Sequence, residues 1–371
     1  MRRSAVTVAI LMASLLPTFH ARGQTGPPPE ETFISENLTL LTTVGSPGVI
    51  GARFQGDVMY VTSVLGLTTY DVSDPANPTQ LGFLPLPHFE NEDVDLGGDI
   101  LLISNDAAES TGILYVIDIS DPAAPALLST LQMGGNPLLG GPGHTASCIK
   151  DCRWAWVTNV GNIDVIDLGD PAAPAKVGTF ETPAGGGVAA HDVQVDRYGY
   201  VWVAGFGGTV AYQLPRDYDG TSLGIQVAMT SEDGFSTYFE EFGIGSGGNP
   251  NDYIHHNSAR NKRVVLITEE DYTRPACKGA GSFQTWNLAV GKGGVPDGTD
   301  LTPLDQWETE VLTANPSSTT ALVCSAHYFD VRGNVVAQGW YEQGLRILDV
   351  SKPTTIRQIG YFVLPNALTW A

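Results

Sequence analysis

The chain has 371 residues, a formal net charge of −21 and 16% charged residues, with 43 glycines and 24 prolines. The low charge and abundant glycine exclude a coiled coil, and an apolar content of 42% is enough for a hydrophobic core, which argues against disorder. Because an acidic surface repels nucleic acid and anionic lipid, we expect no nucleic-acid partner.

The first 23 residues have the form of a secretory signal peptide. Two arginines precede an apolar run over residues 5–16 that is too short to span a bilayer, and Ala21 and Gly23 place small side chains at positions −3 and −1 of a cleavage site. A membrane anchor is the alternative, but no stop-transfer segment follows. We expect an exported protein, periplasmic or extracellular, with no transmembrane anchor after cleavage. Residues 24–36 would then be a linker and residues 37–371 a single domain.

Internal repeats carry the strongest signal for the fold. Each copy is a β-rich run that ends in aspartate and is followed, after three further residues, by proline. Short strands flank each copy, separated by Gly, Asn and Pro turns. A period of about 45–50 residues with four strands per unit predicts an all-β fold, a β-propeller of four-stranded blades. The clear copies are Leu67–Pro75, Leu114–Pro122, Ile163–Pro171 and Leu345–Pro353, and degenerate copies lie at 210–214 and 283–288.

The repeats form six recognisable units. Residues 37–44 have the pattern of an outermost strand without a blade of its own, the kind that closes a propeller by pairing with the last blade. The repeat pattern would begin another unit near Pro365, which leaves open an incomplete seventh blade. The six units begin near Gly48, His88, His144, His191, His255 and His327.

The repeated pattern V-x-D-[VI]-S-[DN]-P, with Ile/Leu-rich flanks, resembles the LVIVD-repeat proteins. The resemblance spans roughly residues 45–365 and is clear in four units and degraded in two. It implies a β-propeller from a family with exported members. It implies no particular activity, because none is established for most of that family.

Six histidines fall at, or just before, the first strand of a unit, and they serve five of the six units. The first strand of a blade is the innermost, so we expect these side chains to converge at one mouth of the central channel. Neutral imidazole binds Cu, Zn, Fe or Ni, and the pattern favours one transition-metal ion as cofactor without distinguishing among these metals. The alternative is a structural device in which each ring bonds the backbone of a neighbouring blade. The candidates are His88, His144, His191, His255, His256 and His327.

Charged residues accompany these histidines. Glu92, Asp192 and Glu269 are candidates to complete the coordination shell or to orient an imidazole. The alternative is that they are solvated loop charges of a very acidic protein. Arg260 is a candidate anion ligand at the channel, with an inter-blade salt bridge as its alternative. The aspartates that end the repeated strands are expected to cap the turn before proline: Asp71, Asp118, Asp167 and Asp349.

The four cysteines fit an exported protein because disulfides persist in oxidising compartments. Three connectivities are open, and we favour Cys148–Cys152 together with Cys277–Cys324. A zinc site is the alternative, weakened by the lack of a second close pair of cysteines.

These features favour an exported β-propeller that acts as a binding or interaction module for an unknown protein or small-molecule ligand. We expect a monomer that holds a transition metal through the channel histidines. The alternative is an extracytoplasmic metalloenzyme, an oxidoreductase or hydrolase that uses the same ion. No catalytic residue is assigned.

Overall fold

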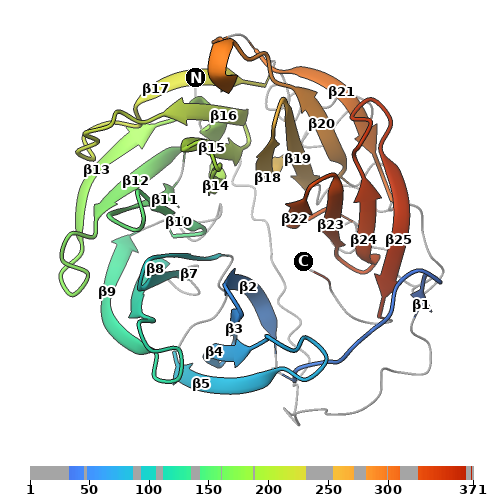
Figure 1. Cartoon of the computed structure of the whole chain (residues 1–371). Helices are drawn as coiled ribbons and strands as arrows, with labels where there is room; N and C mark the ends of the chain where they lie inside the picture. Colours follow the sequence, from blue (N-terminus) through green and yellow to red (C-terminus); the bar gives the residue numbers. More distant parts are fainter. Residues whose placement is uncertain are drawn as a thin grey trace, which may run out of the picture.

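The fold is described by a computed structural model that covers residues 33–45, 48–86, 93–105, 112–134, 143–159, 161–186, 189–230, 254–270, 281–298, 300–309, 325–364 and 369. In these residues, six antiparallel sheets surround a central axis as the blades of a propeller (Figure 1). Blade one is β2 (Val49–Gln55), β3 (Val58–Ser63), β4 (Gly66–Asp71) and β5 (Thr79–Pro85); blade two is β6 (Val94–Gly97), β7 (Ile100–Asn105), β8 (Gly112–Asp118) and β9 (Ala126–Gly134); blade three is β10 (Ala146–Ile149), β11 (Trp154–Asn159), β12 (Asn162–Asp167) and β13 (Ala175–Glu181).

The other three blades follow the same order. Blade four is β14 (Ala190–Val195), β15 (Tyr200–Gly205), β16 (Gly208–Gln213) and β17 (Ile225–Met229); blade five is β18 (Ile254–Asn261), β19 (Val264–Glu270), β20 (Phe283–Asn287) and β21 (Thr302–Trp307); blade six is β22 (Phe329–Arg332), β23 (Val335–Trp340), β24 (Gly344–Asp349) and β25 (Arg357–Val363). The described helical segments are two 3₁₀ turns, Pro183–Gly185 and Lys292–Gly294, and neither is long enough to cross a membrane. The predicted all-β propeller of four-stranded blades is confirmed.

The ring closes through a strand near the N-terminus of the described residues. Strand β1 (Phe33–Ile34) pairs with β25 and becomes a fifth, outermost strand of blade six. The prediction placed this strand at residues 37–44, but the side chain of Asn37 donates to Ile359 O at 2.7 Å, and residues 37–44 form a turn and irregular backbone. The closing strand therefore lies in the stretch expected to be a linker.

A seventh sheet does not occur among the described residues. Near the C-terminus, Thr369 makes a single β-bridge with Tyr341, at the end of blade six. Because β1 pairs with β25, the last blade contains strands from both ends of the described residues, and the six sheets close the ring (Figure 1).

The aspartates of the repeat motif cap the turns that follow the third strands, as predicted. Asp71 Oδ1 accepts the backbone N–H of Ser73 at 2.8 Å, and such hydrogen bonds favour the ionised carboxylate. Hydrogen bonds from Ser351, and then from Arg357, lower the pKa of Asp349 to about 2. The equivalent caps are Asp118 to Ser120, Asp167 to Gly169 and Asp349 to Ser351.

The turn after the cap also locks neighbouring blades together. The hydroxyl of Thr69 in blade one donates to the carbonyl of Pro122, the repeat proline of blade two, at 2.6 Å. Ser129 makes the same contact to Pro171 of blade three at 2.6 Å. The motif therefore sets both the turn within a blade and the contact between blades.

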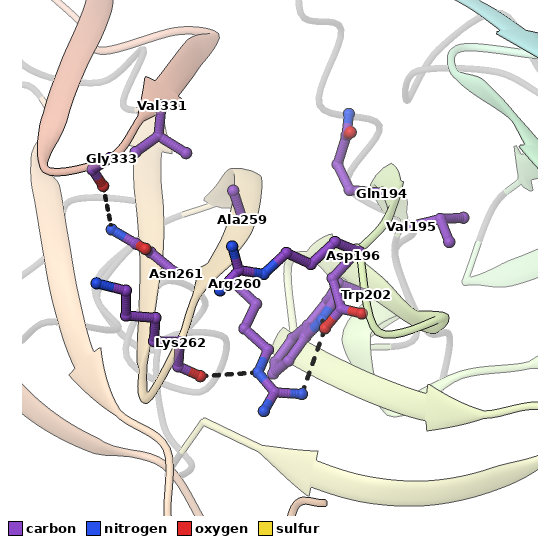
Figure 2. Close-up of a pocket in the computed structure, with 11 residues that line it drawn as sticks. Gln194, Val195, Asp196, Trp202, Ala259, Arg260, Asn261, Lys262, Val331 and Gly333 are labelled. Carbon is purple, nitrogen blue, oxygen red and sulfur yellow. Dashed lines mark hydrogen bonds and ion pairs between the residues drawn. The ribbon is translucent and has the colours of Figure 1, made fainter. Parts of the chain in front are cut away.

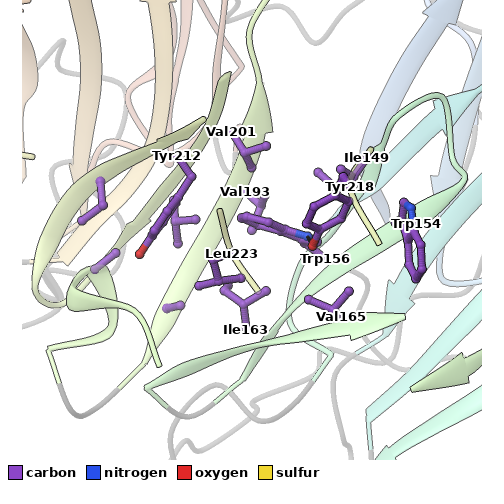
Figure 3. Close-up of a cluster of buried hydrophobic side chains, with 14 residues drawn as sticks. Ile149, Trp154, Trp156, Ile163, Val165, Val193, Val201, Tyr212, Tyr218 and Leu223 are labelled. Atoms are coloured by element: carbon purple, nitrogen blue, oxygen red, sulfur yellow. Dashed lines mark hydrogen bonds between the residues drawn. The ribbon is translucent and has the colours of Figure 1, made fainter. Parts of the chain in front are cut away.

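The core lies between the faces of adjacent blades, where wide aromatic side chains fill the gap (Figure 3). Trp156 of β11 is fully buried and donates its indole N–H to Tyr218 Oη at 2.8 Å. Its ring also packs edge-on against Tyr212, with the ring centroids 5.9 Å apart. Blade three is thereby joined to blade four by both packing and a buried hydrogen bond.

One predicted disulfide is present. Cys148 and Cys152 are joined across the turn between β10 and β11. The other predicted pair, Cys277 and Cys324, lies outside the described residues.

Candidate metal centre

Irregular pairing marks the start of the innermost strands. The register of β14 against β15 shifts between Ala190 and Asp192, and that of β18 against β19 shifts between His255 and Asn257. The extra residues are therefore His191 and His256. A β-bulge of this kind bends the strand and re-aims a side chain, and it is typical of strands beside functional sites.

The other two described channel histidines have the same local structure. His144 lies between Gly143 and Thr145, which both hydrogen-bond Thr158 of the neighbouring strand. His327 donates its N–H to Gly339 O, while Gly339 N–H donates to the next residue, Tyr328. The backbone pairing just before the inner strand is therefore irregular in both blades: residues 143–145 face Thr158, and His327 and Tyr328 both bond Gly339.

Contacts between blades hold the backbone of these bulges. Ser104 Oγ of blade two donates to His144 O at 2.8 Å, and Thr145 Oγ1 of blade three donates to His191 O at 2.7 Å. His191 Nδ1 in turn lies 3.2 Å from His256 O in blade five. The backbone at His144, His191 and His256 is therefore held in each case by the blade before it, which orders these imidazoles around the channel.

Four imidazoles form an arc from blade three to blade six. The ring centroids of His144 and His191 are 4.4 Å apart, and those of His191 and His256 are 4.1 Å apart. The next pair, His256 and His327, is separated by 4.0 Å. His144 Nε2 and His191 Nε2 approach to 2.9 Å. The structure therefore brings together four of the six predicted histidines.

A fully buried carboxylate, Glu270 at the end of β19, lies at the focus of this arc. Its Oε2 is 3.9 Å from the Nε2 atoms of both His191 and His256, and its Oε1 is 3.9 Å from Nε2 of His327. The hydroxyl of Tyr341 donates to Oε1 at 2.5 Å. The phenol orients the carboxylate, and Oε2 faces the two central imidazoles.

His191, His256 and Glu270 are grouped so that they could hold a metal ion. One donor atom from each lies within 4.8 Å of the others. Ligand atoms bonded to one zinc ion at about 2.0–2.2 Å lie roughly 3–4 Å apart, so small side-chain rotations would bring these donors into place. Imidazole with carboxylate suits Zn, Cu, Fe or Ni. His144 and His327 stand at either end of the group.

The protonation of the central histidines fits this use. Burial lowers the pKa of His191 well below its usual value, and the neighbouring rings of His144 and His327 lower it further. Burial likewise lowers the pKa of His256, aided by His327, His191 and His144. Both rings are therefore neutral at pH 7, which is the form that binds metal.

The hydrogen bonds of these two rings also fit metal ligands. A carbonyl only accepts, so the contact of His191 Nδ1 with His256 O places the proton on Nδ1 and a lone pair on Nε2. Metal-bound histidines usually make this second bond to a carbonyl or carboxylate. Both ring nitrogens of His256 are buried without a hydrogen-bond partner among the described residues, which is rare for buried polar atoms.

Three predicted site residues lie elsewhere or outside the described residues. His255 Nδ1 is 2.9 Å from Thr209 Oγ1, so this ring enters the packing between blades four and five. His88 and Glu92 fall outside the described part of the chain. Successive side chains of a strand point to opposite faces, which separates the surroundings of His255 from those of His256, the extra residue of the bulge.

Glu269 also faces away from the imidazoles. Its Oε2 accepts hydrogen bonds from Ser282 Oγ at 2.8 Å and from Gln284 Nε2 at 3.3 Å. Successive side chains of a strand point to opposite faces, so only one of two adjacent glutamates can face the histidines. Sequence reasoning favoured Glu269 and missed Glu270 and Tyr341. Side chains alternate between the two faces of the strand along residues 264–270. This alternation could identify the glutamate that faces the histidines only once the neighbouring strands were known.

Asp192 belongs to a separate group of buried charges beside the histidine arc. Arg53 Nη2 lies 3.1 Å from Asp93 Oδ1, and all three residues interact electrostatically. Burial raises the pKa of Asp192 well above its usual value, and Asp93 raises it further. Burial raises the pKa of Asp93 to about 7, against the opposing effect of Arg53. Asp93 and Asp192 therefore keep their protons at pH values at which exposed carboxyl groups are already ionised.

Replacing Asp93 by asparagine is expected to flatten the pH dependence of stability. The pKa of Asp93 is about 7 in the folded protein and near 3.8 in the unfolded chain. The stabilisation that comes from its protonation is therefore complete below pH 3.8 and is lost as the pH rises through 7. Between pH 5 and 8 the wild-type free energy of unfolding should fall by roughly 1–3 kcal/mol more than that of Asp93→Asn. Urea unfolding at the two pH values measures this. The exposed Asp99→Asn is the control, and equal slopes for all three proteins would contradict the assignment.

Arg260 forms the inter-blade salt bridge that was the alternative to anion binding. Its Nη1 lies 3.5 Å from Asp196 Oδ2 of blade four, Nε donates to Lys262 O at 2.9 Å, and Nη2 donates to Gly294 O at 2.5 Å. All three guanidinium nitrogens are thus engaged within the protein.

The fold and the site define a class: a six-bladed β-propeller with a buried His–Glu cluster where its inner strands begin. The LVIVD repeat model matches residues 54–83 and 107–132, which lie in blades one and two. The chain is therefore a β-propeller that carries LVIVD repeats. No curated protein matches the sequence.

Solved structures share the fold at low sequence identity. The β-propeller domain of Cps50 (Swd1) from Myceliophteria thermophila has a TM-score of 0.54 at 11% identity, and the match covers 86% of this chain and 89% of that one. A candidate 6-phosphogluconolactonase from Bacteroides fragilis has a TM-score of 0.53 at 12% identity, with coverages of 85% and 81%. At such identities the similarity shows the fold alone.

Proposed function

We propose that this protein is an exported β-propeller that binds one transition-metal ion through His191, His256 and Glu270. His144 and His327 flank these ligands and are placed to complete the coordination. The observation that carries the proposal is the buried, neutral ring of His256, whose nitrogens lack hydrogen-bond partners in the described residues and face a carboxylate. A metal ion satisfies both the lone pair and the carboxylate charge.

Export is part of the same proposal. The N-terminal 23 residues have the organisation of a signal peptide, and a disulfide joins Cys148 to Cys152. Outside the cytoplasm the propeller would present its two faces to a protein or small-molecule ligand, as an interaction module.

A second candidate is a metalloenzyme that uses the same ion on a small substrate. This function is favoured because solvent reaches the arc at its His144 end. His144 is half-buried, whereas His256 and His327 are almost completely buried. A substrate would reach the ion beside His144, where the ion would act as a Lewis acid or redox centre.

Metal content measured by inductively coupled plasma mass spectrometry tests the proposal. The full-length chain is purified without a metal-affinity tag, and His256→Gln is compared with His255→Gln, the same change at a neighbouring residue outside the arc. We expect about one metal ion per chain in the wild type and in His255→Gln, and a loss of most of it in folded His256→Gln. Wild-type protein that takes up no Zn, Cu, Fe or Ni after dialysis against each would overturn the proposal.

A further inference from the structure

A cavity of about 270 Å³ lies at the opposite ends of the strands that carry the histidines (Figure 2). Strand β14 begins beside His191 and ends at Val195, and β18 runs through His256 to Asn261. The turns that follow these strands, together with the turn between β22 and β23, surround the cavity. At about 30 Å³ per water molecule, it has room for a ligand on the order of ten non-hydrogen atoms.

The wall of this cavity contains an ion pair, between Asp196 and Arg260, whose two charges neutralise each other. Asp196 Oδ2 is 3.5 Å from Arg260 Nη1 and accepts the indole N–H of Trp202 at 3.1 Å (Figure 2). Its Oδ1 accepts backbone N–H groups from Tyr198 and Tyr200. The carboxylate in the wall is thus fully used, and the lining residues that the structure describes include no second carboxylate for the other basic side chains.

Two further basic residues line the cavity: Arg197 and Lys262. Arg197 Nη2 donates to Tyr198 Oη at 2.7 Å, and its guanidinium lies 4.9 Å from the centre of that ring. This contact holds the arginine at the rim. In a chain with a net charge of −21, Arg197 and Lys262 beside the Asp196–Arg260 ion pair make a local positive region.

Lys262 occupies a position that favours glycine. It is the first residue of the two-residue turn between β18 and β19 and has φ of 61°. The same position in blades one, two and six holds Gly56, Gly98 and Gly333, with φ between 56° and 66°. A side chain is disfavoured in this left-handed region.

The second residue of this turn is also basic in blade five and not in blades one, two and six. Blades one and two have aspartate there and blade six has asparagine, whereas blade five has Arg263. Among the four blades with a two-residue turn at this position, only blade five has Lys-Arg in place of Gly-Asp or Gly-Asn. Strained backbone of this kind is typical of functional positions.

We propose that this cavity binds a small organic anion that carries a phosphate or carboxylate group. Lys262 and Arg197 provide the charge, and Asn261, which donates to Gly333 O at 2.7 Å, holds the turns of blades five and six together around the ligand. The site is separate from the metal centre, and neither depends on the other. A charged ligand here would be recognised by point charges and donors at the mouth of a preformed cavity.

Isothermal titration calorimetry tests the site with two probes, inorganic phosphate and succinate, at constant ionic strength. Lys262→Gly removes the charge and relieves the backbone, so folding stability should be kept or raised while binding is lost. Lys150→Gly is the matched control, because Lys150 is also an exposed lysine with positive φ in an inner turn, but it lies outside the cavity.

We expect at least one probe to bind the wild type with a dissociation constant of about 1 mM or tighter. Lys262→Gly should weaken binding at least ~10-fold, while Lys150→Gly binds like the wild type. Binding of phosphate alone or of succinate alone identifies the recognised group. The proposal is overturned by a wild type that binds neither probe, by unchanged binding in Lys262→Gly, or by equal losses in the two variants.

Discussion

Replacing Glu270 by glutamine is expected to weaken transition-metal binding at least ~100-fold while the protein remains folded. The change keeps the shape of the side chain and its contact with Tyr341 but removes the charge that faces the Nε2 atoms of His191 and His256. Because that charge is fully buried, the metal-free variant should be at least as stable as the metal-free wild type. Titration with Zn²⁺ in competition with a chelator measures the affinity.

The neighbouring residue provides the control for this prediction. Glu269→Gln makes the same chemical change one position earlier, where the carboxylate accepts hydrogen bonds from Ser282 and Gln284. We expect its metal affinity to stay within a few-fold of the wild type. Equal affinity losses in the two variants would mean that the total negative charge at the end of β19, and not the carboxylate in the arc, determines metal affinity.

Trp156→Ala is expected to destabilise the propeller by roughly 3–5 kcal/mol. The indole is fully buried between blades three and four, and its loss leaves a large cavity as well as an unpaired hydroxyl on Tyr218. Guanidinium unfolding followed by circular dichroism measures the change. Phe54→Ala is the control, because this ring is 61% exposed and its loss should change stability by less than about 0.5 kcal/mol. Similar effects of the two substitutions would contradict the assigned core.

The repeat motif was sufficient to predict the blades because its information is local. A strand that ends in aspartate fixes the cap, and the cap fixes the turn before proline, as Asp71 and Ser73 illustrate. The position of the closing strand was not predictable in the same way. Pairing of Phe33 with Val363 joins residues far apart in sequence, and no local pattern distinguishes this short strand from the segment that follows it.

The candidate site was predictable only in part. Recurrence at the first strand indicated that the histidines converge, and four of them do. Which of His255 and His256 joins the arc depended on the register of β18, including its bulge, and a hydrophobic pattern does not record register. The choice between Glu269 and Glu270 required the pairing of β19 with its neighbours, since adjacent residues of a strand face opposite sides. Residue types are thus readable from sequence, but their orientation depends on register.

The most direct test of the metal centre is anomalous X-ray scattering from a crystal of the wild-type protein equilibrated with Zn²⁺, recorded on both sides of the zinc absorption edge. We expect one strong peak within about 2.0–2.2 Å of His191 Nε2, His256 Nε2 and a carboxylate oxygen of Glu270. A map without a peak among these three side chains, or with zinc only at surface carboxylates, would contradict it.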